Sequence, residues 1–328
     1  MKAALLPDRG VLRVSGDGAR NFLHGLVTAD LLKLAPGAAR FCALLTPQGK
    51  IIADFIAVEA PAAQPALGGG GFFLDIPRAR GTTLVDKLNL YKLRAKVVIE
   101  NLSEGLGVLA AWDGTCGESC GGAWEGVGLC YGDPRLPALG LRAMLPPRLA
   151  ADAVADLGAT LVDAREYEAH RIALGVPRGG IDFSYGHAFP HETDMDLLGG
   201  VDFAKGCYVG QEVVSRIEHR GTARTRAVPF RYDDDAPEAG VAVMAGGRTV
   251  GITGSAAGGH GLALLRLDRV AEAMAHGVPL TAGGRPIRLV KPDWARFAFR
   301  GETKPAAGET KPAAGKTKPA AHGTKAAE

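Results

Sequence analysis

The spacing of apolar residues along the chain predicts short strands and helices in an irregular order. Alternating apolar and polar residues indicate a strand over 10–16, and apolar residues at helical spacing indicate a helix over 17–27. Two apolar runs at 39–45 and 50–58 flank a turn sequence at 46–49, which predicts a hairpin. Strands followed by helices, rather than a strict alternation of the two, are typical of an α+β fold.

The pattern changes after residue 221, where short apolar runs are separated by glycine-rich turns. The expected strands are 228–232, 241–244, 248–254, 262–267 and 287–290. Short, evenly spaced strands of this kind predict a small β-barrel. We therefore expect a first domain over 1–225 in two lobes with a break near 100–105, a barrel over 226–296, and a tail over 297–328.

The tail repeats a heptapeptide, Gly-Glu-Thr-Lys-Pro-Ala-Ala, at 301–307 and again at 308–314. The repeat contains no Leu, Ile or Val that could form a core. Its proline is incompatible with the interior of a helix. We expect a disordered and mildly basic tail, which is either a solubilising appendage or a transient contact for acidic partners.

Two features stand out in the middle of the chain. A helix is predicted over 163–174, and its inward stripe includes Arg171. A buried arginine requires a carboxylate or an anionic ligand as a partner. The following segment, 178–200, has no periodicity, and long irregular segments that are ordered are usually functional.

The densest group of unusual residues is Lys205-Gly206-Cys207-Tyr208-Val209-Gly210-Gln211-Glu212. We expect a loop that ends at Gly210 and then a helix of about two turns, so that Cys207 lies just before a helix N-terminus. The charge of Lys205 and the helix dipole would both favour the thiolate. The Gln-Glu pair falls in the first turn, where the amide can reach back to the loop. A buried structural cysteine is the alternative interpretation.

Composition narrows the class of protein. A length of 328 residues with 47% apolar and 22% charged residues is typical of a soluble globular protein of two domains. The formal net charge of +3 gives no reason to expect direct binding of nucleic acid. No run approaches the ~20 apolar residues of a membrane-spanning helix. The first residues, 1–8, lack the features of a signal or mitochondrial leader, so we expect a cytoplasmic protein, and a monomer.

The metal-ligand patterns in the sequence are weak. Cys116 and Cys120 are four residues apart in a glycine-rich stretch without a nearby histidine, so we expect no metal site there. His187 and His191 are also four apart, but Pro190 prevents them from sharing one face of a helix. The odd number of cysteines, five, does not indicate a disulfide framework.

The stretch 205–212 resembles the signature K-G-C-Y-x-G-Q-E of the YgfZ-type folate-binding proteins. These are relatives of the glycine-cleavage aminomethyltransferase, and they include mitochondrial iron–sulfur assembly factors. The resemblance covers about 1–296, in chain order. Further segments that resemble the family are 13–17, 22–25, 28–30, 46–50 with Asp54, 91–94, Arg171 with 175–177, 190–192 and 251–253.

The resemblance implies two folate-binding lobes and a barrel around a central funnel. It also implies a tetrahydrofolate-type ligand, partners that assemble or carry iron–sulfur clusters and, in bacteria, an effect on tRNA modification. By its place in the family's pattern, Glu192 is the candidate for pairing with pterin N–H groups, and Asp54 is a second acid near the folate. Arg171, Arg94 or Arg216 would hold the anionic tail of folate, although each is equally well explained as a structural ion pair.

The chain also departs from its relatives. Aminomethyltransferases have two adjacent acids where this chain has Ala53 and Asp54, which weakens proton transfer at the folate nitrogen. They also lack the cysteine of the signature. His170 stands where some members carry a tryptophan, so one stacking contact to folate is in doubt.

Three hypotheses follow. The first is a folate-binding factor of iron–sulfur cluster assembly or repair that uses Cys207, with Lys205, Gln211 and Glu212 as the other candidate catalytic residues. The second is a folate-dependent aminomethyltransferase or methyltransferase. The third is an interaction scaffold whose pocket no longer binds folate.

Overall fold

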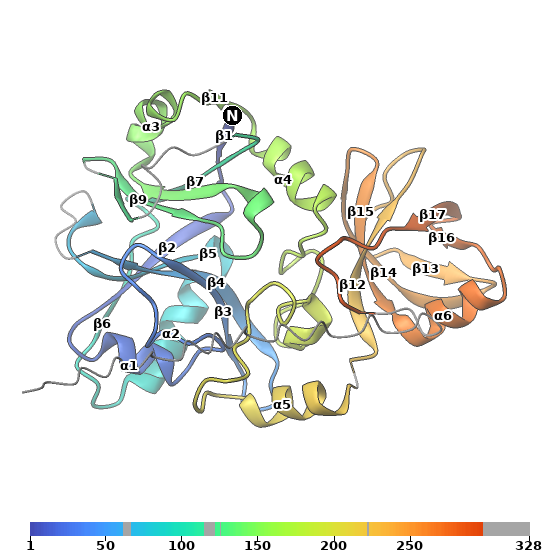
Figure 1. The fold of residues 1–328 in the computed structure, drawn as a ribbon, viewed down its shortest axis with the longest axis horizontal. Coiled ribbons are helices and arrows are strands. Elements are labelled where there is room, and N and C mark those ends of the chain that lie inside the picture. The colour runs from blue at the N-terminus through green and yellow to red at the C-terminus, as the bar shows by residue number, and fades with distance from the viewer. Residues whose placement is uncertain (62–66, 115–121, 125, 222, 298–328) are drawn as a thin grey trace, which may run out of the picture.

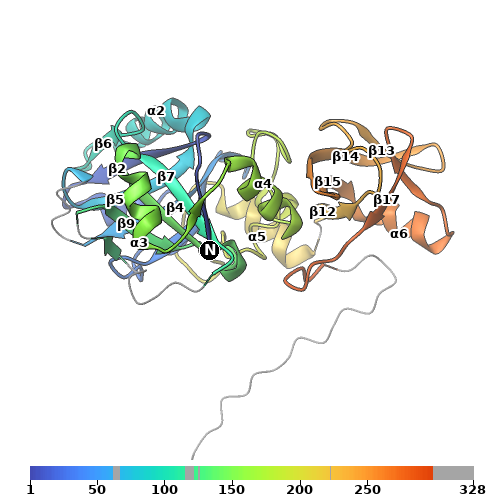
Figure 2. The same ribbon diagram turned by 90° about the horizontal axis from the view of Figure 1, so that it is seen from above.

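The computed structural model describes residues 1–61, 67–114, 122–124, 126–221 and 223–297. Two stacked β-sheets form one end of the molecule, and a closed barrel forms the other (Figure 1). Helices α4 (Ala164–Ala173) and α5 (Gln211–Arg220) lie between these two parts, as Figure 2 also shows. The expected α+β class with a C-terminal barrel is confirmed. Cys116, Cys120 and all but the first residue of the expected tail lie outside the described residues.

The first sheet is antiparallel and has the strand order β3-β4-β5-β2-β6. Its strands are β2 (Arg9–Ser15), β3 (Ala39–Leu45), β4 (Ile51–Ala60), β5 (Gly71–Pro77) and β6 (Val98–Asn101). The predicted hairpin is the pair β3 and β4, and the turn between them begins at Thr46 as expected.

Strand β4 is apolar along nearly its whole length because both of its faces are covered. Phe55 and Ala57 pack towards α1 and α2, whereas Ile56 and Val58 belong to the core that the two sheets share. Side chains alternate along a strand, so Asp54 lies on the same face as Ile56 and Val58. Its carboxylate is therefore directed between the sheets, and only 7% of this residue is exposed.

The second sheet has the strand order β11-β1-β7-β10-β9-β8. Its strands are β1 (Lys2–Leu5), β7 (Gly107–Trp112), β8 (Gly122–Trp124), β9 (Gly128–Gly132), β10 (Leu141–Leu145) and β11 (Thr160–Leu161). Strand β1 was not predicted, because four residues are too few to show a period. It pairs with β7 and β11, so the N-terminus of the chain is part of the second sheet.

Helices cover the outer faces of both sheets. Beside the first sheet lie α1 (Ala19–His24) and α2 (Gly81–Lys92), and beside the second lies α3 (Ala150–Asp156). Helix α1 is shorter than the predicted 17–27, because Val27 pairs with Leu44 of β3 instead of continuing the helix. Short 3-10 helices are η2 (Arg78–Arg80), η3 (Pro137–Leu139), η4 (Pro147–Leu149) and η5 (Pro190–Thr193).

The barrel has the strand order β12-β15-β14-β13-β16-β17 and closes where β12 pairs with β17. Its strands are β12 (Thr225–Arg231), β13 (Ala242–Ala245), β14 (Arg248–Ala257), β15 (His260–Arg266), β16 (Leu280–Ala282) and β17 (Arg285–Leu289). Helix α6 (Leu267–Ala275) packs Val270 and Ala273 against the barrel core. Within the described ranges, no helix has the length and apolar character needed to cross a bilayer.

Candidate functional site

The signature loop is packed backbone to backbone against the turn between β3 and β4. Gly210 has a φ of 82°, and a Cβ atom there would lie 2.5 Å from the carbonyl oxygen of Thr46. Gly49 in the turn has a φ of 79°, and a Cβ atom there would lie 3.1 Å from Cβ of Val213. Both glycines are needed, because a side chain would meet a neighbour and the left-handed backbone disfavours other residues. Two motifs that are far apart in the sequence thus form one unit.

Lys205 anchors the start of the signature loop. Its ammonium nitrogen donates hydrogen bonds to the carbonyl oxygens of His24, Val27 and Ala29, at 2.6, 2.5 and 2.9 Å. Burial lowers the pKa of Lys205 to about 8, whereas the three carbonyl acceptors favour the ammonium form. Because all three ammonium protons are taken by the end of α1 and the segment after it, we assign Lys205 an anchoring role in place of the expected activation of the thiol.

Cys207 lies on the surface between two buried anchors. Lys205 and Tyr208 are each 7% exposed, whereas Cys207 is exposed. Tyr208 belongs to the core shared by the two sheets. The loop therefore points its lysine and tyrosine inwards and presents the thiol to solvent, so the alternative of a buried cysteine is wrong.

The other members of the signature have local roles. The amide of Gln211 donates to the carbonyl oxygen of Gly206 at 3.4 Å, so it reaches back to the loop as predicted. Glu212 pairs with Arg216 one helical turn later at 2.6 Å, and both side chains are exposed. A pair of this kind contributes little to stability. Arg216 is thus placed in a surface ion pair on α5.

A cavity of about 230 Å³ lies where the two sheets meet α4 and the segment 177–185. Asp54 lines it and accepts a hydrogen bond from the hydroxyl group of Tyr185 at 2.5 Å. Burial and the neighbouring Asp54 raise the pKa of Tyr185. The cavity is rich in cations, which are Arg9, Arg135, Arg142, Arg165, Arg171 and Arg178. Its acids are Asp8, Asp54 and Glu168.

Buried ion pairs next to the cavity tie the two sheets together. Asp75 of β5 accepts from Arg142 of β10 and from Arg9 of β2, both at 2.6 Å. Burial alone would raise the pKa of Asp75, but these two guanidinium groups hold it below its usual range. Arg142 also donates to Asp133 at 2.8 Å. The sequence carried no signal for these pairs, since their members come from different strands and from the loop after β9.

Arg171 reaches from α4 to the barrel. Its Nε and Nη2 atoms donate to the carboxylate of Glu168. Its Nη1 atom donates to the carbonyl oxygen of Val176 and to Asp182, the latter at 3.0 Å. Nη2 also donates to the hydroxyl group of Ser255 of β14 at 2.8 Å. An arginine has five N–H donors, and all five are used. The inward orientation predicted for Arg171 is confirmed, but its guanidinium is engaged in structural contacts rather than available for an anionic ligand.

The remaining predicted ligand residues lie apart from the cavity. Glu192 of η5 is half-buried and accepts from the backbone N–H of Phe189 at 2.8 Å. Arg94 is exposed just after α2. Neither residue is among those that line the cavity with Asp54. Tyr185, which the sequence analysis did not single out, lies in the irregular segment 178–200 that was expected to be functional.

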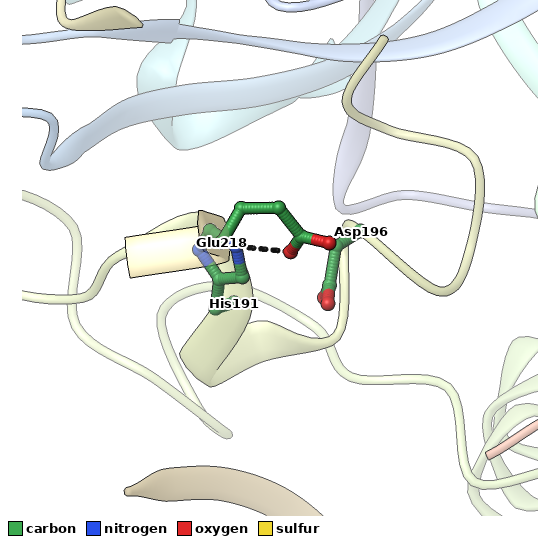
Figure 3. Close-up of side chains that lie close together, drawn as sticks. All are labelled: His191, Asp196 and Glu218. Carbon is green, nitrogen blue, oxygen red and sulfur yellow. Dashed lines mark hydrogen bonds and ion pairs between the residues drawn. The ribbon is translucent and has the colours of Figure 1, made fainter. Parts of the chain in front are cut away.

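A second cluster of polar side chains lies where α5 meets η5. His191, Asp196 and Glu218 each place one ligand-type atom within 4.8 Å of the other two (Figure 3). Nε2 of His191 lies 3.0 Å from Oε2 of Glu218. Asp196 forms a bidentate pair with Arg226 of β12, at 2.6 and 2.8 Å.

Comparisons with known proteins agree with this architecture. The family described as CAF17, C-terminal beta-barrel domain, matches residues 224–297. The glycine cleavage system aminomethyltransferase T from Bartonella henselae has a similar structure, with a TM-score of 0.70 over 90% of this chain and 86% of that chain. At 15% sequence identity this likeness shows the fold alone.

The sequence relatives are iron–sulfur cluster assembly factors. The human protein named iron-sulfur cluster assembly factor IBA57, mitochondrial, is 34% identical over 288 residues, which cover 81% of this chain and 77% of that protein. The mouse protein of the same name is 32% identical over 317 residues, or 88% of this chain and 84% of that protein. The Mycosarcoma maydis homolog is 36% identical over 70% of this chain, and the chain spans 57% of that relative's length.

The expected cytoplasmic location is contradicted by these relatives, because their names describe them as mitochondrial proteins. That expectation rested on the polarity of residues 1–8. Lys2–Leu5 form β1 inside the second sheet, so these residues are part of the folded domain. The polarity of a stretch that includes a strand of the folded domain is therefore no evidence for a cytoplasmic location.

The resemblance seen in the sequence is confirmed by relatives that match most of the chain, by the barrel and by the aminomethyltransferase-like fold. The chain belongs to the YgfZ-like family of IBA57 iron–sulfur cluster assembly factors.

Proposed function

We propose that this protein acts in the assembly or repair of iron–sulfur clusters, that Cys207 is its reactive group, and that it binds a tetrahydrofolate-type ligand in the arginine-rich cavity. A defect in cluster assembly would also lower tRNA modification by thiolating enzymes that carry such clusters. The alternative is a folate-dependent aminomethyltransferase or methyltransferase.

The proposal rests mainly on the exposure of the Cys207 thiol at the surface. Lys205 and Tyr208 are buried on either side of it, and the thiol is exposed. Thiolates are the usual ligands of iron–sulfur clusters. An exposed thiol on a loop held at both ends can meet a cluster or a partner protein without rearrangement of the fold. The names of the relatives support the same role.

The cavity supports the folate part of the proposal. Arg165 and Arg178 line this cavity with exposed or partly exposed side chains, which suit the anionic glutamate tail of a folate. Asp54 uses one carboxylate oxygen for Tyr185, which leaves the other available for a pterin N–H group. Tyr167 and Tyr185 contribute aromatic surface to the lining.

The role of Cys207 is tested by complementation of cells that lack their own iron–sulfur assembly factor of this family. Wild type should restore the activity of an iron–sulfur enzyme, and Cys207→Ser should not, although it folds and binds tetrahydrofolate equally well. Cys42→Ser is the matched control, because Cys42 is a buried thiol on β3 whose pKa is raised by burial. Full rescue by Cys207→Ser would contradict the proposal.

Folate binding is tested by calorimetry with tetrahydrofolate. Asp54→Asn should weaken binding at least about tenfold, the effect of one lost charged hydrogen bond. Asp233→Asn is the control, because Asp233 pairs with Arg288 on the exposed surface of the barrel. No heat with wild type would select the scaffold hypothesis.

The fold favours the aminomethyltransferase alternative, whereas the acidic residues available for proton transfer do not. The fold resembles aminomethyltransferase T, but β4 carries Ala53 next to Asp54, so a second acid for proton transfer is missing. This alternative predicts turnover in a one-carbon transfer assay, at a rate that Cys207→Ser leaves intact.

A further inference from the structure

The cluster of His191, Asp196 and Glu218 is separate from both Cys207 and the cavity. None of the three residues lines the cavity, and they come from η5, the loop after it and α5 (Figure 3). His191 is 1% exposed, whereas the side chain of Glu218 is 44% exposed. The side chain of Asp196 is 6% exposed, so the cluster has two buried ligand side chains and one side open to solvent.

Two buried polar atoms next to this cluster have no hydrogen-bond partner. They are Nδ1 of His191 and Oδ2 of Asp194, two of only five such side-chain atoms in the part of the chain that the structure describes. Buried polar atoms are nearly always satisfied, and an unsatisfied one often marks the position of an ion or a water molecule. Nε2 of His191, rather than Nδ1, faces Glu218, so these two atoms belong to the surroundings of the cluster and not to its three ligand atoms.

The charges around the cluster are unbalanced. Arg226 bonds Asp194 at 3.0 Å and Asp196 at 2.6 Å, and Glu218 adds a third carboxylate. The guanidinium thus bonds two of these carboxylates, whereas the carboxylate of Glu218 contacts His191. A cation placed among Asp196, Glu218 and the imidazole of His191 would reduce this surplus of negative charge.

We propose that His191, Asp196 and Glu218 bind a divalent transition-metal cation of the Zn²⁺ or Mn²⁺ type. Imidazole nitrogen and carboxylate oxygen suit these ions, whereas an imidazole ligand disfavours Mg²⁺ and Ca²⁺. The bidentate contact with Arg226 leaves a lone pair on each oxygen of Asp196 and orients the carboxylate, as outer-shell partners of metal ligands do. The cation would pin α5, and with it the signature loop, to η5.

The spacing of the ligand atoms fits such an ion after a small adjustment. Bonds of ~2.1 Å put two ligand atoms on opposite sides of a cation ~4.2 Å apart. The observed atoms lie within 4.8 Å of one another. Nε2 of His191 and Oε2 of Glu218 already lie 3.0 Å apart, and Glu218 is the member of the three whose side chain is partly exposed.

The test uses Mn²⁺, which prefers oxygen and nitrogen ligands and so does not report on the thiol of Cys207. Titration of the full chain with Mn²⁺, followed by electron paramagnetic resonance, should show one bound ion per chain, and Zn²⁺ should displace it. Glu218→Gln should weaken binding at least tenfold. Mn²⁺ should also raise the Tm of wild type and leave the Tm of Glu218→Gln unchanged.

Glu212→Gln is the matched control, since Glu212 is an exposed acid on the same helix that pairs with Arg216. It should bind Mn²⁺ as wild type does. The proposal is overturned if wild type binds neither ion, or if Glu218→Gln and Glu212→Gln bind Mn²⁺ equally well, which would mean adventitious binding elsewhere. Binding of tetrahydrofolate should be the same in both variants, because the site is independent of the cavity.

Discussion

The ammonium nitrogen of Lys205 lies 2.5 Å from the carbonyl oxygen of Val27, so the first residue of the signature is bonded to the segment that follows α1. The ammonium group also donates hydrogen bonds to the carbonyl oxygens of His24 and Ala29. This contact holds the loop that presents Cys207.

Replacement of Lys205 by methionine should destabilise the protein. The change removes three hydrogen bonds from a charged group and leaves buried carbonyl oxygens without a donor, which should lower the free energy of unfolding by about 3 kcal/mol. Urea denaturation measures this loss. Lys96→Met is the control because Lys96 is exposed. An equal, small effect of both changes would show that the three contacts add nothing to stability.

The two glycines of the signature should respond differently to alanine. Gly210→Ala places a Cβ atom 2.5 Å from the oxygen of Thr46 at a φ of 82°, whereas a Cβ atom at Gly206 meets nothing within 4 Å. We expect Gly210→Ala to cost at least about 2 kcal/mol of unfolding free energy and Gly206→Ala to stay within about 0.5 kcal/mol. Thermal melts of the two variants provide the comparison, and similar Tm values would refute the close packing of loop and turn.

Arg171 and Arg216 are both candidate folate-binding residues by sequence. Their replacement should nevertheless have very different effects on the free energy of unfolding. Arg171→Met breaks a buried network that joins α4 to the barrel and removes the guanidinium that pairs with Asp182 and Glu168. The expected loss is about 3–5 kcal/mol of unfolding free energy. Arg216→Met removes only an exposed pair and should change it by no more than about 0.5 kcal/mol. A mild effect of Arg171→Met on denaturation would contradict the structural role.

His24 should make the stability depend on pH. Burial, and then the charge of Lys205, lower the pKa of His24 below its usual value of 6.5 in the folded protein. The unfolded state therefore binds a proton more readily, so the free energy of unfolding should fall as the pH drops below about 6.5. This contribution is fully present above the unfolded pKa and is lost once the pH has passed below the folded pKa.

Denaturation measured between about pH 7 and about pH 5 tests this prediction. The slope of the unfolding free energy with pH should be smaller for His24→Gln than for wild type. His276→Gln should keep the wild-type slope, since His276 is exposed at the end of α6. Equal slopes in wild type and His24→Gln would exclude His24 as the source of the pH dependence of stability.

The sequence predicted much of the local structure because short-range patterns encode it. The two apolar runs at 39–45 and 50–58, with the turn sequence between them, predicted the hairpin of β3 and β4, and glycine at 210 predicted the start of α5. The inward position of Arg171 also followed from its spacing on a helix. Strand β1 was missed because four residues carry no measurable period, and the helix over 17–27 was overextended because Val27 pairs with β3.

The signature residues themselves, the class of the fold and the barrel were thus readable from the chain alone, since residue type, spacing and turn chemistry are local properties. Which atoms those residues touch was decided only by tertiary structure. Lys205 bonds carbonyl oxygens near residue 27, Asp54 meets Tyr185, and His191 meets Glu218, in each case across a distance in sequence that no periodicity spans. Burial and packing bring these partners together, and they settle whether a charged side chain is an anchor or is left open to a ligand.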